Sequence, residues 1–301
     1  MNLEKNKLIV IEGPTAVGKT ALCVNLAKKL GTEVVSADSR QFFKEMAIGT
    51  AKPTVEEMDG VKHHFVNCRS VKEPYSAGSY EVDALEVIGK LFETHDSVIL
   101  TGGSGLYIQA VCDGMDAFPP IPTEIRDRWT RRIDEEGVTK IAQELAEADP
   151  ATYELVDTLN PRRVLRAMEV LEVTGKGLAE WHSGTKPRDF DIVRIGLERD
   201  REELYERINL RVDLMLEAGL MDEVKRLTQW KELTALKTVG YKEIFGYLDG
   251  EYDMEEAIRL VKRNTRRYAK RQLSWFKRDE EMTWFHPEDE AGIINHINAH
   301  S

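Results

Sequence analysis

Residues 13–20 read Gly13-Pro14-Thr15-Ala16-Val17-Gly18-Lys19-Thr20. The stretch satisfies the pattern G-x-x-x-x-G-K-[ST], and it lies between an apolar run at residues 8–11 and a segment with leucines at helical spacing, residues 21–30. A glycine-rich turn between a strand and a helix lets backbone amides converge on anionic oxygens at the positive end of the helix. We therefore predict a phosphate-binding loop, with Lys19 at the terminal phosphate and the Thr20 hydroxyl as a ligand of Mg²⁺.

Strand-like and helix-like segments alternate through the first part of the chain. Short apolar runs at residues 33–36 and 97–100 predict two further strands, and apolar residues at helical spacing between positions 80 and 92 predict a helix before the second of them. Gly31 is a natural end for the helix predicted at 21–30. This alternation is typical of an α/β fold with a mainly parallel sheet flanked by helices, whose ligands bind beyond the carboxyl ends of the strands.

The pattern changes near residue 118. From there to about residue 185 the sequence is helical and rich in charge, without a convincing strand, and residues 191–197 then resemble a strand that returns to the sheet. Further helices are predicted at residues 204–216 and 255–278. We therefore predict a P-loop catalytic core at residues 1–117 and 187–301, which carries an all-helical insertion domain at residues 118–186.

Composition excludes several classes of protein. With 301 residues, 42% of them hydrophobic and 32% charged, the chain can bury a core and is not disordered as a whole. The net charge of −11 excludes a nucleic-acid-binding protein that is basic over its whole surface, but it is compatible with a local basic patch. The three cysteines lie far apart, which argues against a zinc knuckle or a disulfide framework. The N-terminus, residues 1–7, is polar, and no apolar stretch is long enough to span a membrane, so we expect a soluble, cytoplasmic protein.

The acidic residues narrow the chemistry. A P-loop ATPase or GTPase usually has a second apolar strand that ends in a Mg²⁺-associated aspartate, whereas residues 97–100 run into Thr101-Gly102-Gly103. Asp38 instead follows the second strand, where it could accept a proton from a nucleophile or simply form a turn. Two classes remain open: a small-molecule kinase with Asp38 as general base, and an enzyme that uses diphosphate as a leaving group. A nucleotide-switch RNA-binding protein is a further candidate, which Asp38 and the absence of an acid at the end of residues 97–100 disfavour.

Further motifs extend from residue 13 to residue 276. They are the phosphate loop, Asp38-Ser39-Arg40-Gln41, Gly49-Thr50-Ala51-Lys52-Pro53, His63-His64, Thr101 to Tyr107, Asn160 to Val170, Gly240-Tyr241-Lys242-Glu243, Asn264 to Gln272 and Trp275-Phe276. In this order they resemble the bacterial tRNA dimethylallyltransferase family. Ser104 stands where the family pattern suggests threonine, a change that keeps the hydroxyl, and Phe43 stands where the family often has tyrosine.

The resemblance implies an activity and its partners. It implies transfer of a dimethylallyl group from dimethylallyl diphosphate to the exocyclic amine of the tRNA adenosine immediately 3′ of the anticodon. It also implies Mg²⁺ as cofactor and the tRNA anticodon stem-loop as partner, and it gives no role to a membrane; we expect a monomer. The base would be flipped into the site, which is easiest in an unpaired anticodon loop.

By the same resemblance, Asp38, Thr101 and Lys19 are the catalytic candidates, although Thr101 could equally well cap the glycine turn that follows it. Residues 13–20 and Arg211 would bind the diphosphate. Arg207 and Arg211 lie four apart on one helix face, but for Arg207 an ion pair with Glu203 or Asp213 is the favoured alternative. The resemblance assigns eight residues to tRNA binding: Asp38, Ser39, Arg40, Gln41, Arg126, Arg162, Arg163 and Arg166. Arg162, Arg163 and Arg166 could stack on bases or pair with phosphates. The alternative is that these three arginines, with Glu169 and Glu172, form an ordinary solvent-exposed helix face.

The last long helix carries the clearest basic pattern. Between residues 257 and 278 there are nine lysines and arginines and no acid. Helical spacing places residues such as Tyr268 toward the core and predicts an outward basic stripe of Arg259, Lys262, Arg263, Arg266 and Lys270. We predict that Arg266 and Lys270 contact the tRNA backbone. His63 and His64 have no partner at metal-ligand spacing, and we expect them to be structural or to line the substrate site.

Overall fold

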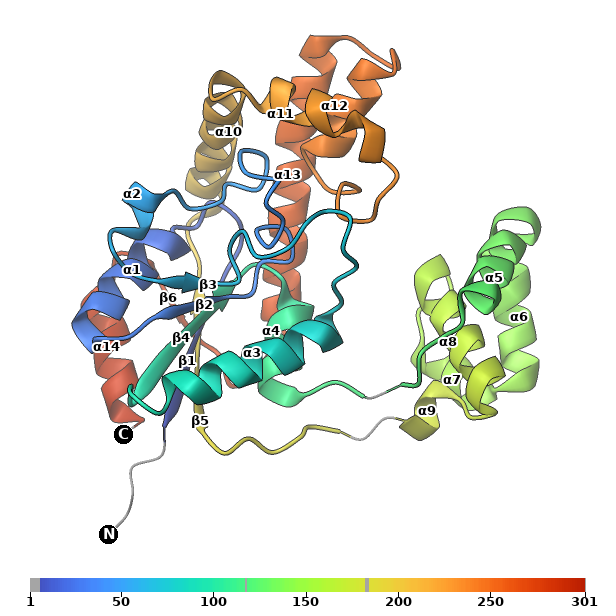
Figure 1. Ribbon diagram of the computed structural model, residues 1–301, viewed down its shortest axis with the longest axis horizontal. Helices are drawn as coiled ribbons and strands as arrows, with labels where there is room; N and C mark the ends of the chain where they lie inside the picture. Colours follow the sequence, from blue (N-terminus) through green and yellow to red (C-terminus); the bar gives the residue numbers. More distant parts are fainter. Residues whose placement is uncertain (1–5, 117, 182–183, 301) are drawn as a thin grey trace. The chain divides into compact units, whose positions relative to one another are not determined.

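The computed structural model describes residues 6–116, 118–181 and 184–300, so most of the predicted polar N-terminus and the core boundary at residue 117 lie outside the described residues. Six strands form one parallel sheet in the order β3-β2-β4-β1-β5-β6 (Figure 1). Their bounds are Lys7–Glu12 (β1), Val34–Ser36 (β2), His63–His64 (β3), Ser97–Gly102 (β4), Asp191–Leu197 (β5) and Thr283–Phe285 (β6).

The four strands predicted from apolar runs are present, and the predicted parallel sheet is confirmed. Two short strands at the sheet edges, β3 and β6, were not predicted. A strand of two or three half-buried residues carries no apolar run, so its pairing depends on the neighbouring strand rather than on its own sequence.

Helices of the sheet-containing part cover both faces of the sheet and continue beyond its carboxyl edge. They span Lys19–Leu30 (α1), Val55–Met58 (α2), Ala77–Leu91 (α3), Gly105–Asp113 (α4), Arg201–Glu217 (α10), Leu220–Leu227 (α11), Tyr241–Leu248 (α12), Met254–Phe276 (α13) and Glu290–Ala299 (α14), with a 3₁₀ turn at Thr228–Trp230 (η1). The helices predicted at 21–30, 204–216 and 255–278 correspond to α1, α10 and α13, and Gly31 ends α1 at φ 62°, as predicted.

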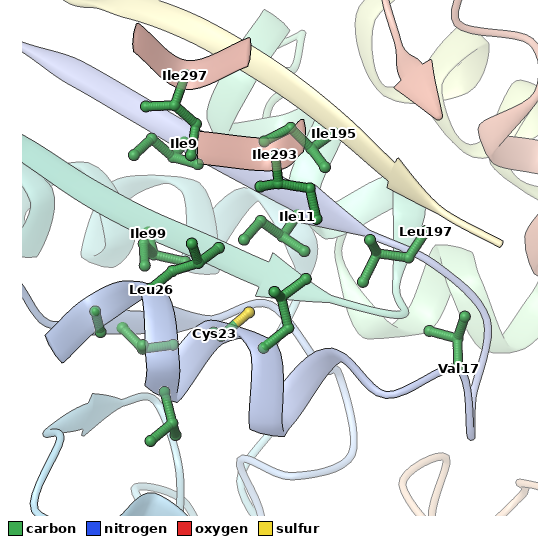
Figure 2. Close-up of a cluster of buried hydrophobic side chains, with 14 of the residues drawn as sticks. Ile9, Ile11, Val17, Cys23, Leu26, Ile99, Ile195, Leu197, Ile293 and Ile297 are labelled. Carbon is green, nitrogen blue, oxygen red and sulfur yellow. The ribbon is translucent and has the colours of Figure 1, made fainter. Parts of the chain in front are cut away.

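Two hydrophobic clusters lie on opposite faces of the sheet, because successive side chains of a strand point to opposite sides. Ile9 and Ile11 of β1 pack against side chains of α1 and α14 (Figure 2). Leu204 and Ile208 of α10 belong to the same cluster. Leu8 and Val10 face the other way and pack against α3 and α4. All four side chains are fully buried, so β1 reads as a continuous apolar run in the sequence.

A third cluster joins α10, α11, α12 and α13 to Phe43 and Met46, which follow β2 along the chain. These helices are connected in sequence after β5. The cluster therefore holds the segment that follows β2 against helices that lie more than 150 residues later in the sequence.

The remaining residues form a separate helical unit. The chain divides into one unit of Met1–Cys112 with Arg188–Ser301 and a second of Asp113–Pro187. The helices beyond residue 118 in the second unit are Thr123–Glu136 (α5), Val138–Ala148 (α6), Pro150–Leu155 (α7), Pro161–Thr174 (α8) and Leu178–Trp181 (α9). They enclose their own apolar cluster around Trp129, Ile141 and Val164, which explains how a charge-rich segment can still fold compactly.

No helix within the described ranges is both long enough and apolar enough to cross a membrane.

Candidate active site

The predicted phosphate loop joins the carboxyl end of β1 to the start of α1. Gly18 adopts φ 116°, a left-handed conformation that favours glycine, and α1 begins at the next residue. The Lys19 Nζ atom donates hydrogen bonds to the carbonyl oxygens of Gly13 (2.8 Å) and Pro14 (2.9 Å). The first amides of α1 have no partner inside the helix, so the turn combines N–H donors with one held cation, the arrangement that an oligophosphate requires.

Burial lowers the pKa of Lys19 to about 8, and the carboxylate of Asp38 opposes that shift. Asp38 and Lys19 line the same two pockets. Asp38 follows the second strand along the chain, as the sequence indicated, and lies beside the phosphate loop. β2, which leads to Asp38, does not neighbour β1, because β4 lies between them.

The Asp38 carboxylate is held by the backbone that follows it. Its Oδ1 atom accepts hydrogen bonds from the amides of Arg40 (2.9 Å) and Gln41 (3.4 Å). Asp38 therefore does form the turn that was considered as the alternative role. Its side chain also lines both pockets, so the turn orients the carboxylate toward the site and the two roles coexist.

Two arginines bind carbonyl groups of the phosphate loop. Arg207 Nε donates to the carbonyl oxygen of Ala16 (2.9 Å), and Arg199 Nε donates to that of Val17 (2.8 Å). The favoured ion pair of Arg207 with Glu203 or Asp213 is therefore wrong. Those acids pair with other partners: Glu203 with Arg199, and Asp213 with Lys262.

Arg211 lies one turn after Arg207 on α10 and reaches the loop itself. Its Nη1 atom donates to the Thr15 hydroxyl at 3.3 Å. Burial lowers the pKa of this guanidinium below its usual value, with the nearby charge of Arg207 adding to the effect. Cations gathered beside a turn of N–H donors favour a multiply charged anion, which would offset their mutual repulsion.

The end of α13 closes the site from another side. The Gln272 Oε1 atom accepts a hydrogen bond from the Thr15 amide (2.9 Å), and its Nε2 atom donates to the carbonyl oxygen of Gly103 (2.7 Å). One buried amide thus ties the phosphate loop to the turn that follows β4. Gln272 was part of a quoted motif but was given no role, because its partners are distant in the sequence.

Thr101 and Thr20 line the smaller of the two pockets together with Asp38 and Lys19. The Thr101 hydroxyl donates to the carbonyl oxygen of Ile11 in β1 (2.9 Å), rather than capping the glycine turn that follows it. Thr20, Asp38 and Thr101 therefore offer three oxygen-bearing side chains at the carboxyl edge of the sheet. His63 lines this pocket as well, whereas His64 Nε2 bonds to Glu33 Oε2 at 2.5 Å.

The other pocket changes character along its length. Gln272 contacts the phosphate loop, whereas Val261, another lining residue of α13, lies about 16 Å away along an ideal helix. The lining away from the loop is mostly apolar and includes Val212, Met215, Leu220, Val239 and Val261. The pocket can therefore hold a molecule that is anionic at one end and apolar at the other.

One face of α13 was predicted to pack into the core. Part of that face lines this pocket instead. Thr265 and Tyr268 are lining residues, and burial raises the pKa of Tyr268 to about 12. Helical spacing cannot distinguish a core from a pocket wall, because both select one face of the helix.

Several residues of the basic stripe on the opposite side of α13 have partners within the protein. Lys262 pairs with Asp213 at 2.6 Å, and Arg259 pairs with Glu256 at 2.6 Å. Arg266 Nη1 donates to Asn209 Oδ1 at 2.5 Å, and Lys270 is exposed. The prediction of a basic stripe without acidic partners is therefore wrong in part. The partners are Asp213 of α10 and Glu256 in the first turn of α13, and both lie outside residues 257–278, where no acid occurs.

The segment predicted to meet tRNA after Asp38 is well ordered by hydrogen bonds. The Ser39 amide donates to Ser104 Oγ (3.0 Å), so the serine in place of threonine keeps this contact. Gln41 Nε2 donates to the carbonyl oxygens of Thr50 and Ala51, each at 3.3 Å. Arg40 lines the same pocket as Lys19 and Asp38.

In the helical unit, Glu169 organises two of the predicted tRNA-binding arginines. Its side chain is 3% exposed and lies 2.9 Å from Arg126 Nε and 3.6 Å from Arg166 Nη1. Glu169 is therefore not part of a solvated helix face, although Arg162 and Arg163 are exposed at the start of α8. The structure brings Arg126 and Arg166 together and leaves the other two arginines facing solvent.

The fold and the site define a class of protein: a P-loop α/β protein with an anion-binding turn, a carboxylate beside it and an apolar extension of the pocket. The chain belongs to the IPP transferase family, whose family model matches residues 41–279. The match begins after the phosphate loop, so the loop geometry and the family match are separate observations.

Similar proteins cover nearly the whole chain. A tRNA dimethylallyltransferase of Cytophaga hutchinsonii is 51% identical over 300 residues, 99% of each chain. A tRNA dimethylallyltransferase 1 of Bacteroides thetaiotaomicron is 47% identical and covers 96% of this chain and 94% of its own. Among solved structures, a full-length tRNA isopentenylpyrophosphate transferase of Bacillus halodurans has a TM-score of 0.74 at 39% identity and covers 98% of this chain and 97% of its own. A eukaryotic dimethylallyltransferase acting on tRNA has a TM-score of 0.78 at 26% identity and covers 98% of this chain and 77% of its own.

Proposed function

We propose that the chain transfers a dimethylallyl group from dimethylallyl diphosphate to the exocyclic amine of the tRNA adenosine immediately 3′ of the anticodon, with release of diphosphate. The observation that supports this most directly is the pocket that has Lys19, Asp38 and Arg211 at one end and an apolar lining at the other. A prenyl diphosphate has the same two-ended chemistry. Membership of the IPP transferase family supports the same assignment.

In the proposed reaction, the adenosine amine attacks the first carbon of the dimethylallyl group. A carbon–nitrogen bond forms, and the bond from that carbon to the diphosphate oxygen breaks with its electron pair on the diphosphate. Lys19 and Arg211 would stabilise the charge that grows on this leaving group. Asp38 would accept the proton that the amine loses, because its carboxylate lines the pocket beside Lys19. Thr101 would contribute a polar contact at the end of β4.

The residues present fit a divalent cation such as Mg²⁺. Thr20, Asp38 and Thr101 place oxygen atoms around one pocket, and Mg²⁺ prefers oxygen ligands with one or two carboxylates and substrate phosphates. No three His, Cys, Asp or Glu side chains form a metal-binding group within the described ranges. In our proposal the Thr20 hydroxyl would help to hold the cation, and the cation would supply additional positive charge to the leaving group.

The anticodon stem-loop of tRNA is the proposed partner. Ser39, Arg40 and Gln41 adjoin the carboxylate that would receive the base, and Arg266 and Lys270 offer positive charge on α13. In the helical unit, Arg126, Arg162, Arg163 and Arg166 are proposed to bind the RNA. We also propose a monomer, because a single chain supplies every residue named here; sedimentation equilibrium tests this.

A small-molecule kinase is the competing function, and one assay separates the two. Purified protein is mixed with unmodified tRNA, Mg²⁺ and radiolabelled dimethylallyl diphosphate, and a parallel reaction contains ATP. We expect label to enter the tRNA and diphosphate to be released. Rapid consumption of ATP without label in the tRNA would overturn the proposal.

A further inference from the structure

One motif quoted above, Gly49 to Pro53, has no role in the proposed reaction. Gly49, Thr50 and Ala51 nevertheless line the pocket that Lys19 and Asp38 line. The segment belongs to no helix or strand, and Ala51 adopts φ 47°, which is a left-handed conformation for a residue with a side chain. Something outside the segment must therefore hold it in this shape.

Glu223 of α11 provides that hold. Its Oε2 atom accepts hydrogen bonds from the amides of Ala47 (2.9 Å) and Ile48 (2.8 Å). Its Oε1 atom accepts one from the amide of Gly49 (2.9 Å) and one from the Tyr241 hydroxyl (2.7 Å). Each carboxylate oxygen thus has two donors, although about 175 residues separate Glu223 from the segment.

The environment of this carboxylate requires these bonds. Glu223 is 3% exposed, and a buried carboxylate is tolerated only where hydrogen bonds replace its lost hydration. The segment can approach so closely because residue 49 is glycine. A Cβ atom there would lie 2.6 Å from the Tyr241 ring, which is closer than real side chains come.

The held segment is connected to the proposed catalytic carboxylate. The carbonyl oxygens of Thr50 and Ala51 accept hydrogen bonds from Gln41 Nε2. The backbone amide of Gln41 in turn donates to Asp38 Oδ1. Glu223 does not line the pocket, but it fixes the backbone that orients a side chain next to Asp38.

We infer that Glu223 is a positioning residue for the transfer reaction: it sets the wall formed by residues 47–51 and, through Gln41, the orientation of Asp38. This inference rests on the proposed function. A purely stabilising residue would affect the folded fraction of the protein, whereas a positioning residue affects the turnover of molecules that are folded. The two roles therefore predict different kinetics.

The test variant is Glu223→Gln, which keeps the shape of the side chain. An amide has one acceptor oxygen and one NH₂ donor, so at least one pair of donors loses its acceptor. With labelled dimethylallyl diphosphate and tRNA, we expect kcat to fall by about tenfold or more, because small misplacements of reacting groups are costly. KM for tRNA should stay within about twofold, and hydrogen exchange of the amides of residues 47–49 should become faster.

Glu45→Gln is the matched control. Glu45 also accepts hydrogen bonds from a hydroxyl and a backbone amide, those of Ser70 (2.6 Å) and Val71 (3.0 Å), but it lines neither pocket. We expect its kcat to equal that of the unaltered protein. An equal loss in both variants, or a kcat for folded Glu223→Gln within about twofold of the unaltered protein, would overturn the inference.

A second variant decides the matter if Glu223→Gln does not fold. Tyr241→Phe removes one of the four donors and leaves the ring against Gly49. A kcat reduced by about twofold or more with unchanged KM supports the inference, and an unchanged kcat overturns it. Absence of transfer by the unaltered protein would instead refute the proposed function, so the two failures are distinguishable.

Discussion

The backbone amide of Thr15 donates a hydrogen bond to Gln272 Oε1 at 2.9 Å, although 257 residues separate the two in the sequence. The other end of the same amide side chain binds the carbonyl oxygen of Gly103 at 2.7 Å. The last turns of α13 therefore fix the distance between the phosphate loop after β1 and the turn after β4. The first prediction concerns this link.

Replacement of Gln272 by glutamate should weaken binding of the diphosphate. Glutamate can still accept from Thr15 but places a second acceptor against the Gly103 carbonyl and adds negative charge beside the anion site. A buried polar group left without its partner costs about 1–3 kcal/mol, so affinity for inorganic diphosphate should fall about tenfold in a calorimetric titration. Gln229→Glu, at an exposed position in η1, is the control and should bind normally. Equal affinities for both variants would contradict the prediction.

Replacement of Asp38 by asparagine should affect turnover rather than tRNA binding. Asparagine can keep the bonds from the amides of Arg40 and Gln41, but it is not a proton acceptor. Loss of a general base typically lowers the rate by about 10²- to 10⁴-fold. Single-turnover kinetics measures the rate, and filter binding measures the affinity for tRNA. A variant that loses only affinity would remove Asp38 from the catalytic residues.

Activity should decline as the pH rises above about 8. Burial lowers the pKa of Lys19 to about 8. The side chain is therefore charged at pH 7 and loses its charge as the pH rises above about 8. Because kcat/KM reports groups of the free enzyme, kcat/KM for the diphosphate substrate should approach a tenfold decrease per pH unit on the alkaline side.

Lys52 also has a pKa lowered to about 8 by burial, and it serves as the control for this profile. The variant Lys52→Arg stays charged over the whole range. The alkaline decline should persist in this variant if Lys19 causes it. Its disappearance would assign the decline to Lys52.

Removal of the Arg207 side chain should weaken diphosphate binding without direct loss of a ligand contact. The variant Arg207→Met loses the bond to the Ala16 carbonyl, which helps to shape the loop. One hydrogen bond from a charged group contributes about 1.5–3 kcal/mol, so affinity should fall by about tenfold or more. Arg201→Met changes an exposed arginine at the start of the same helix and should leave the affinity unchanged.

The double variant Arg266→Ala, Lys270→Ala should bind tRNA less tightly and with a weaker salt dependence. Each lost phosphate contact lowers the slope of log affinity against log salt by roughly 0.7–0.9. Arg259→Ala is the control, because Arg259 is already paired with Glu256. An unchanged slope in the double variant would mean that Arg266 serves only the contact with Asn209.

Local signals in the sequence were sufficient for much of the fold. The four correct strand predictions, the main helices and the phosphate loop rest on patterns within a few residues, such as the apolar run of β1 and the glycines around Lys19. These patterns are readable because a strand buried on both faces must be apolar throughout, and a turn around an anion needs glycine. The edge strands β3 and β6 lacked such patterns, whereas α11 was not predicted although Leu220, Val224 and Leu227 follow helical spacing.

Long-range partners were decided by the tertiary structure alone. Arg207 has acids at helical spacing, yet its partner is a carbonyl of the phosphate loop, because α10 passes beside that loop. Gln272 and Glu223 show no local pattern, and their roles depend on backbone amides and a carbonyl group about 170 to 260 residues away. The sequence by itself determined which residues can bind a phosphate or accept a proton. Only the packing of α10, α11 and α13 against the carboxyl edge of the sheet determined which of them meet, because such contacts depend on geometry between segments and not on the spacing within one.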